Sequence, residues 1–257
     1  MTRVQQFFQR IGMDPDTQIR QDAAFLGQVQ SHCVCAIAYE NLDILAGKPL
    51  DLTEDALFEK IVLRGRGGYC FENNGLLACM LREMGFSVTE RFARYLRGET
   101  GLPMRRHRLS VVQLDDGAYM CDIGIGQTAP RLPVRLEEGT PQVQGSEVYR
   151  FRQDPLHGWV LQERKDGQWK DYLCFADVQA FPIDFVQPSF FCEKHPDSVF
   201  NKRPMVAIKT PTGRRSLDDR CYKVFENDQL CAQEDAISDA RMSALLEEVF
   251  LIGKTGI

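Results

Sequence analysis

The sequence lacks the features that mark membrane, secreted or nucleic-acid-binding proteins. No apolar run approaches the roughly 20 residues that span a bilayer, so we expect no membrane contact. The segment MTRVQQFFQRIG has no apolar block followed by a small-residue cleavage site, which predicts a cytoplasmic protein. A formal charge of −5 argues against nucleic-acid binding, because phosphates require a concentrated basic surface.

Metal-binding and nucleotide-binding motifs are also missing. None of the nine cysteines forms the CxxC pair that opens a zinc site, so we expect no metal. An odd number of cysteines in a chain of 257 residues is more typical of reduced thiols than of a disulfide framework. Neither GxxxxGK[ST] nor GxGxxG occurs. A redox or metal-binding module built on His32, Cys33 and Cys35 is the non-enzymatic hypothesis.

Helical patterns dominate the beginning of the chain. Apolar residues recur at helical spacing from residue 4 to 11, after the candidate N-cap Thr53, and from residue 70 to 84. Gly85 stands where a left-handed C-terminal cap is expected. These patterns predict a helical first part.

The middle of the chain is expected to be rich in β-structure. After Ser87 the apolar period changes towards two. Asp116-Gly117 and Asp166-Gly167 are turn signals. The predicted strands cover residues 88–96, 107–114, 118–125, 148–151, 159–164 and 169–175.

The last part of the chain predicts a linker, a short strand and a helix. Prolines and turn formers over residues 181–204 favour an irregular segment, and residues 205–209 favour a strand. Ser238 could cap a final helix whose apolar stripe we expect to pack on the core. The stripe consists of Met242, Leu245, Leu246, Val249 and Phe250.

A candidate nucleophile stands at the start of the helix predicted from residue 70. The segment RGRGGYCFENN, residues 64–74, places Cys70 after a glycine-rich turn. The unpaired N–H groups and positive end of a helix favour the thiolate, which is the form that attacks carbonyl groups. Taken alone, Cys70 would be a small buried hydrophobic residue.

His107 and Asp122 are the candidate partners of Cys70. An imidazole accepts the thiol proton, and a carboxylate fixes the tautomer of the imidazole. His107 starts a predicted strand, and Asp122 stands in an otherwise apolar one. With Asp116-Gly117 as the turn, Asp122 would pair with Val111, and His107 would lie roughly 13 Å further along the strand. We therefore predict a longer turn or a β-bulge that brings the two together.

Together these segments resemble the arylamine N-acetyltransferase family. Its hallmarks are Arg-Gly-Gly-(Tyr or Trp)-Cys, then a histidine that leads a strand, then Asp-(Val or Ile)-Gly. Here they read RGGYC at residues 66–70, HRL at residues 107–109 and DIG at residues 122–124. Residues 39–42 and 195–200 also resemble family segments.

The resemblance implies an α+β fold around a catalytic core like that of papain-like cysteine proteases and transglutaminases. A helical N-terminal domain, residues 1–86, would carry the nucleophilic cysteine, and a central β-barrel, residues 87–190, would carry the histidine and the aspartate. Residues 191–257 would form a linker and a small C-terminal α/β lid. No oligomeric state is implied.

The resemblance also implies a reaction and a set of site residues. Cys70, His107 and Asp122 would form a catalytic triad, and acetyl-CoA would acetylate Cys70 before an aromatic amine or hydrazine takes the acetyl group in a ping-pong cycle. No metal cofactor is implied. The expected substrate contacts are Tyr69, Phe71, Ile125 and Gly126, and the expected structural supports are Asn74 and an ion pair of Glu40 with Arg66.

Two other reaction classes use the same residues. A macrolactam-forming amide synthase would take its acyl group from a carrier-protein thioester, and Ile125 in place of a frequent aromatic residue leaves room for it. A papain-like or transglutaminase-like cysteine hydrolase would attack amides without coenzyme A.

Overall fold

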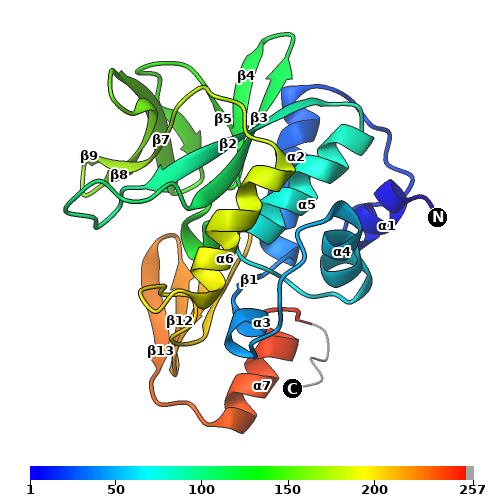
Figure 1. The fold of residues 1–257 in the computed structure, drawn as a ribbon, viewed down its shortest axis with the longest axis vertical. Helices are drawn as coiled ribbons and strands as arrows, with labels where there is room; N and C mark the ends of the chain where they lie inside the picture. Colours follow the sequence, from blue (N-terminus) through cyan, green and yellow to red (C-terminus); the bar gives the residue numbers. More distant parts are fainter. Residues whose placement is uncertain (253–257) are drawn as a thin grey trace.

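Helices form the first part of the computed structural model, which describes residues 1–252 (Figure 1). The predicted helices near the N-terminus, after Thr53 and from Cys70 are confirmed, and Gly85 has the predicted left-handed backbone with φ +87°. Their apolar faces pack into one core with strands of the neighbouring sheet. The helices are α1 (Arg3–Arg10), α2 (Ala23–Ala36), α3 (Leu42–Leu45), α4 (Glu54–Phe58), which continues as a π-helical turn (Glu59–Leu63), and α5 (Cys70–Glu83).

An eight-stranded antiparallel sheet follows and curls into a nearly closed barrel beside α5 (Figure 1). Its order is β5-β4-β3-β2-β9-β8-β7-β6. Side-chain hydrogen bonds link the two edges of this sheet, β6 and β5. Gln142 bonds to the backbone of Arg135, and Gln144 bonds to the backbone of Leu132. The strands are β2 (Ser87–Tyr95), β3 (His107–Leu114), β4 (Gly117–Cys121), β5 (Val134–Arg135), β6 (Gln142–Gln144), β7 (Glu147–Asp154), β8 (Gly158–Lys165) and β9 (Gln168–Phe175).

The hairpin between β3 and β4 differs from the prediction. Leu114 pairs with Gly117, so the two-residue turn is Asp115-Asp116 and not Asp116-Gly117. The ladder continues to the pair of Ser110 with Cys121 without a register shift, so the predicted bulge or longer turn is wrong. The earlier turn moves Asp122 two residues closer to His107, and β4 ends at Cys121, which frees Asp122 to leave the ladder. The position of the turn, and not a bulge, therefore brings Asp122 towards His107.

The prediction of an irregular segment over residues 181–204 is wrong in its first half. A 3₁₀ turn (Pro182–Phe185) leads directly into helix α6 (Val186–Lys194). Pro182 and Pro188 each stand in a first turn, where a backbone N–H is not needed for the helix. Helix α6 lies beside α5 in the view of Figure 1.

A second antiparallel sheet of five strands forms the C-terminal part, in the order β1-β10-β11-β12-β13. Its edge strand β1 comes from the helical part of the chain, so residues distant in sequence build one sheet. Helix α7 (Asp239–Glu248) is capped by Ser238 and packs its stripe against this sheet, as predicted. Residues 253–257 of the expected lid lie outside the described residues. The strands are β1 (Tyr39–Glu40), β10 (Met205–Lys209), β11 (Gly213–Asp218), β12 (Cys221–Glu226) and β13 (Gln229–Glu234).

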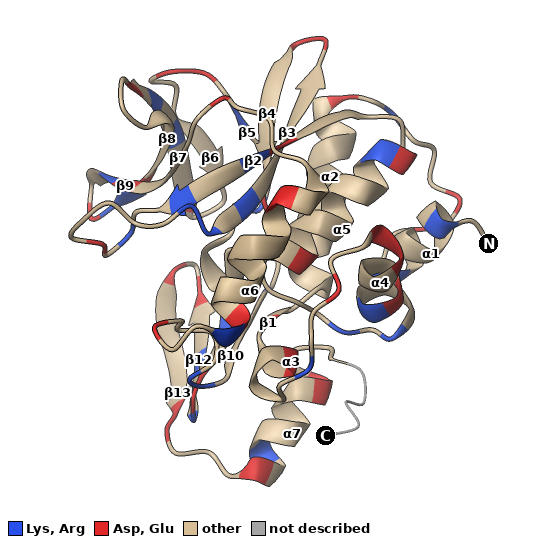
Figure 2. Ribbon diagram, viewed as in Figure 1, with Lys and Arg blue, Asp and Glu red and all other residues tan. Residues whose placement is uncertain are grey.

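The fold class is confirmed as α+β, with helices, a barrel-like sheet and a second small sheet. The division into three domains at residues 86/87 and 190/191 stays a prediction. Among residues 1–252, no helix has the length and apolar character needed to cross a membrane. Lys and Arg are interspersed with Asp and Glu over all parts of the chain (Figure 2).

Candidate active site

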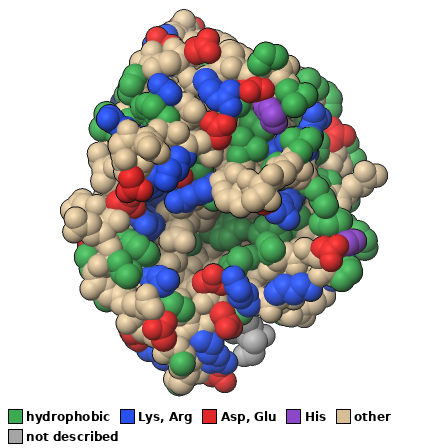
Figure 3. All heavy atoms as spheres, turned by 90° about the vertical axis from the view of Figure 1, so that its left-hand side faces the viewer, with side chains coloured by type: hydrophobic (Ala, Val, Ile, Leu, Met, Phe, Trp, Pro, Cys, Tyr) green, Lys and Arg blue, Asp and Glu red, His purple; other side chains and the backbone are tan. Residues whose placement is uncertain are grey.

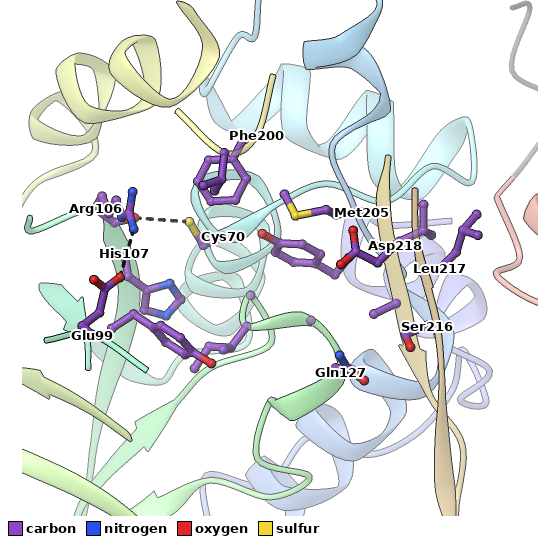
Figure 4. Close-up of a pocket in the computed structure, with 18 residues that line it drawn as sticks. Cys70, Glu99, Arg106, His107, Gln127, Phe200, Met205, Ser216, Leu217 and Asp218 are labelled. Atoms are coloured by element: carbon purple, nitrogen blue, oxygen red, sulfur yellow. Dashed lines mark hydrogen bonds and ion pairs between the residues drawn. The ribbon is translucent and has the colours of Figure 1, made fainter. Parts of the chain in front are cut away.

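A cavity of about 360 Å³ lies where the helices, the barrel and the C-terminal sheet meet. Figure 3 shows a hollow in the surface with apolar side chains on its floor and charged side chains around it. Cys70 from α5, His107 from β3 and the loop after β4 line one side of the cavity, and strands β10 and β11 line the other (Figure 4). The structure thus brings together residues from all three parts of the chain.

Cys70 is the first residue of helix α5, as predicted, and is 3% exposed. Its N-terminal neighbour Tyr69 has an extended backbone and acts as the N-cap residue. The carboxylate of Glu72 accepts the backbone N–H of Tyr69 at 3.3 Å, which stabilises the start of the helix. The thiol of Cys70 contacts the backbone oxygen of Arg106 at 3.7 Å, next to His107 in the chain.

His107 and Asp122 form a direct buried contact. Nε2 of His107 lies 2.5 Å from Oδ2 of Asp122, and the two residues are 6% and 0% exposed. The carboxylate accepts through Nε2–H, so Nδ1 is the ring nitrogen left for another partner. His107 and Cys70 both point into the cavity (Figure 4). This is the arrangement in which an imidazole can take a thiol proton while a carboxylate orients it.

The second oxygen of Asp122 is held by two donors. Oδ1 accepts from Nδ2 of Asn74 at 2.8 Å and from the backbone N–H of Gly124 at 2.8 Å. Oδ1 of Asn74 in turn accepts the N–H of Ile123 at 2.8 Å. Asn74 therefore ties the third residue of the site to the helix that carries Cys70, one turn beyond the nucleophile.

Gln30 is a supporting residue that the sequence analysis missed. Its Oε1 accepts the backbone N–H of Asp122 at 3.2 Å, and its Nε2 donates to the oxygen of Pro130 at 2.9 Å. Gln30 is 1% exposed in the middle of α2. The signal was a glutamine within an apolar helical pattern, since a buried amide needs specific partners.

The expected ion pair of Glu40 and Arg66 is present, with Nη2 of Arg66 2.6 Å from Oε1 of Glu40. Asp43 adds a second carboxylate at 3.1 Å from Nη1. Burial lowers the pKa of Arg66, but these two carboxylates outweigh it, so the pKa is raised overall. Arg66 lies directly before Gly67-Gly68, and the backbone N–H of Glu40 donates to the oxygen of Gly68 at 3.0 Å, so the pair fixes the chain that leads to Cys70.

The four expected substrate contacts divide into two groups. Ile125 and Gly126 line the cavity. Tyr69 and Phe71 are both 0% exposed, lie in an apolar cluster with Phe185 and do not line the cavity, and their contact with a substrate stays a prediction. Side chains of neighbouring residues in a strand or helix point in different directions, which a linear motif does not resolve.

Comparisons with known proteins agree with this geometry. A family model described as N-acetyltransferase matches residues 22–255. The arylamine N-acetyltransferase of Mycobacterium bovis is 37% identical over 224 residues, which cover 83% of this chain and 77% of the relative. This chain belongs to the arylamine N-acetyltransferase family.

Solved structures of arylamine N-acetyltransferases share the whole fold. The enzyme from Salmonella typhimurium aligns with a TM-score of 0.94 at 28% identity, covering 100% of this chain and 93% of that chain. The enzyme from Mycobacterium marinum in complex with CoA aligns with a TM-score of 0.90 at 30% identity, covering 97% and 92%. The chain is therefore an acetyltransferase, and the comparisons support neither the amide synthase nor the cysteine hydrolase.

The electrostatics of the arylamine N-acetyltransferase site differ from the simple helix argument. Burial raises the pKa of Cys70 well above that of an ordinary thiol, and nearby Cys192 and Asp122 raise it further. Backbone hydrogen bonds with Arg108 and Phe71 act in the opposite direction but do not prevail. The helix N-terminus alone is therefore not enough, and a thiolate here requires a positive partner, which a protonated His107 would supply.

Other cavity-lining residues were not expected from the motifs. Tyr39, Tyr95 and Phe200 are aromatic residues of the cavity wall, and Glu99 and Arg106, which also line it, form an ion pair at 3.4 Å. The remaining lining residues are Gly124, Gln127, Val199, Met205, Val206, Ala207, Ser216, Leu217 and Asp218. Most come from the C-terminal sheet, so only the folded chain shows that they line the same cavity as Cys70 and His107.

No set of three His, Cys, Asp or Glu side chains within residues 1–252 is arranged to hold a metal ion. Two residues of the metal-binding hypothesis, His32 and Cys33, make other contacts. Nδ1 of His32 contacts the oxygen of Ile11 at 3.0 Å, and Cys33 is 0% exposed in the core.

Proposed function

We propose that this enzyme carries the acetyl group of acetyl-CoA on Cys70 and passes it to an aromatic amine or hydrazine. The observation that carries the proposal is the contact of 2.5 Å between the buried Asp122 and His107, which lines the same cavity as Cys70. Support for the donor comes from the Mycobacterium marinum relative, whose structure is a complex with CoA.

The proposed first half-reaction acetylates the thiol. His107 takes the proton of Cys70, and the thiolate attacks the thioester carbonyl of acetyl-CoA. The carbon–sulfur bond to coenzyme A breaks, and the departing thiolate takes the proton from His107. Asp122 keeps Nε2 protonated and stabilises the imidazolium during this exchange.

The proposed second half-reaction returns the thiol. The acceptor nitrogen attacks the carbonyl of the acetyl-cysteine while His107 accepts its proton, and the carbon–sulfur bond to Cys70 breaks. The thiolate is then reprotonated by His107. Tyr39, Tyr95, Phe200 and Ile125 give the cavity flat and apolar walls, which suit an aromatic acceptor.

Intact-mass measurement of the protein after incubation with acetyl-CoA tests the proposal. We expect one acetyl adduct in the wild type and none in Cys70→Ala. Cys231→Ala is the matched control and should keep the adduct. Because Cys231 is exposed, loss of the adduct in this variant would indicate non-specific acylation of a surface thiol. A wild type without an adduct would refute acetyl-CoA as the donor. An acceptor screen with aniline-like amines and arylhydrazines then tests release of the acetyl group.

We also propose that the enzyme acts in the cytoplasm. All nine cysteines are free, including Cys33 and Cys35, which lie close together in the sequence. Free thiols in this number fit a reducing compartment. Fractionation of the native source with an antibody against the protein would test this location.

A further inference from the structure

Helix α6 reaches the residue before the nucleophile through a chain of buried hydrogen bonds. The phenol oxygen of Tyr69 lies 2.6 Å from Oγ of Ser189, and that Oγ lies 3.0 Å from Oε1 of Glu193. The three residues are 0%, 2% and 8% exposed. Oε2 of Glu193 accepts the backbone N–H of Leu50 at 3.4 Å. The chain thus links α6 and the loop at Leu50 to the N-cap of α5.

The chemistry of the three groups sets the direction of these bonds. The carboxylate of Glu193 accepts, so the hydroxyl of Ser189 donates its single proton to it. Tyr69 must then donate to Ser189. Burial raises the pKa of Tyr69 well above its usual range, so the phenol keeps this proton at neutral pH.

Apolar side chains could fill this space without the cost of burying three polar groups. The surroundings are an apolar cluster that includes Phe71, Phe185 and Cys192. A polar group in such a place costs free energy unless it forms a hydrogen bond. Hydrogen bonds are directional, whereas apolar packing is not, so this chain of bonds can fix the orientation of its members. Here the group whose orientation is fixed is the phenol of Tyr69.

Several contacts fix the position of Tyr69, and because Cys70 is the next residue in the chain, they also restrict the position of Cys70. Its ring meets Phe71 and Phe200 edge-on, at centroid distances of 5.4 and 5.5 Å. Its backbone N–H is bonded to Glu72, so the phenol oxygen is the remaining point at which the side chain can be fixed. Phe200 lines the cavity, and a shift of the Tyr69 ring would therefore reach both the nucleophile and the cavity wall.

We propose that Ser189 and Glu193 are positioning residues for the nucleophile, which act through the phenol of Tyr69 to hold Cys70 where its thiol meets His107. The inference rests on the proposed role of Cys70 as the acylated residue. Neither side chain lines the cavity, so neither contacts substrate.

The test compares Tyr69→Phe, Ser189→Ala and the double variant with the wild type. The first readout is the pH dependence of Cys70 alkylation by iodoacetamide, which requires neither coenzyme A nor an acceptor. We expect each single variant to alkylate about 10-fold more slowly at mildly acidic pH, because a displaced thiol shares its proton less well with His107. The double variant should be no slower than the single ones, since both remove the same chain. Ser189→Thr, which keeps the hydroxyl, should restore part of the rate.

Tyr119→Phe is the matched control. The phenol of Tyr119 also donates to a carboxylate, Asp116, at 2.6 Å, but at the tip of the β3–β4 hairpin away from the cavity. It should lose stability without a change in the alkylation profile. Thermal unfolding of every variant separates folding from positioning, because alkylation is measured on the folded protein.

Wild-type alkylation profiles in Tyr69→Phe and Ser189→Ala would overturn the inference, whatever their stability. So would losses that multiply in the double variant, or an equal loss in Tyr119→Phe. Failure of the proposed function is distinguishable, because a wild type that is not acetylated by acetyl-CoA leaves the comparison of alkylation profiles intact.

Discussion

Nε2 of His107 lies 2.5 Å from Oδ2 of Asp122, and the other oxygen of that carboxylate is bonded to Asn74 and to the backbone of Gly124. The aspartate is thus fixed from helix α5 and from its own loop, and through it the orientation of the imidazole is fixed as well. Cys70 and Asn74 belong to the same helix, so the thiol and the side chain that holds Asp122 share one rigid support.

Asp122→Asn should abolish most of the activity while the protein stays folded. An amide donates where the carboxylate accepts, which favours the wrong tautomer of His107, and we expect acetylation of Cys70 to slow by about 10³- to 10⁴-fold. Rapid-quench mass measurement of the acetyl-enzyme gives this rate. Asp154→Asn is the control, because Asp154 forms a comparable contact of 2.9 Å with His157 away from the cavity. Near-normal rates in Asp122→Asn would contradict the assigned role.

His107→Gln should move the alkylation of Cys70 to higher pH. Burial raises the pKa of this thiol, so without the imidazole it should react only above the pH of an ordinary thiol, whose pKa is about 8.5. In the wild type, proton transfer to His107 should preserve alkylation at mildly acidic pH. Peptide mapping after labelling follows Cys70 and the exposed Cys231 in the same sample, so the second thiol is an internal reference. Identical profiles for Cys70 in the two proteins would exclude a proton transfer to His107.

Gly124→Ala should disturb the site through a close backbone approach. A Cβ at this position would lie 2.7 Å from Cα of Cys70 and 2.6 Å from Nδ2 of Asn74. The strain should cost about 1–3 kcal/mol of stability and reduce kcat/KM, because relief requires the loop of Asp122 to move away from α5. Urea unfolding and steady-state kinetics measure both effects. Gly101→Ala should change neither, since no atom lies within 4 Å of its added Cβ.

Arg66→Met should strongly destabilise the fold near the nucleophile. It leaves the carboxylate of Glu40, with a 0% exposed side chain, without the guanidinium that contacts it at 2.6 Å. We expect a loss of about 3–5 kcal/mol in the free energy of unfolding, and a partial recovery in the double variant Glu40→Gln/Arg66→Met. Arg64→Met is the control, because its ion pair with Glu59 is exposed at 67% and 46% and should contribute less than about 1 kcal/mol. Equal losses in the two single variants would argue against a buried charge network.

Local elements were predictable because their signals lie within a few residues. Ser238 and Gly85 mark helix ends through backbone groups one turn away, Thr53 stands at the N-cap position of its helix without a side-chain hydrogen bond, and the change of apolar period at Ser87 marks the start of the strands. The missed helix α6 shows the limit of such signals. Pro182, in the 3₁₀ turn before α6, and Pro188, in α6 itself, are both typical of turns, and only their place in a first turn makes them compatible with a helix.

The hairpin shows how a one-residue difference decides a site. Asp115, Asp116 and Gly117 allow two positions for the same two-residue turn, and the sequence pattern favoured the wrong one. The observed register follows from the packing of both strands against α5 and the barrel, which no short segment contains.

By itself the sequence determined the chemistry that is available: a thiol at a helix start, an imidazole at a strand start and a carboxylate in the next predicted strand, in an order that resembles one enzyme family. The tertiary structure decided which of these groups meet, that Gln30 and helix α6 support them, and that strands β10 and β11 complete the cavity. The physical reason is distance along the chain. Caps and periodicity act over a few residues, whereas Cys70, His107 and Leu217 come together only when the four separate hydrophobic clusters have formed.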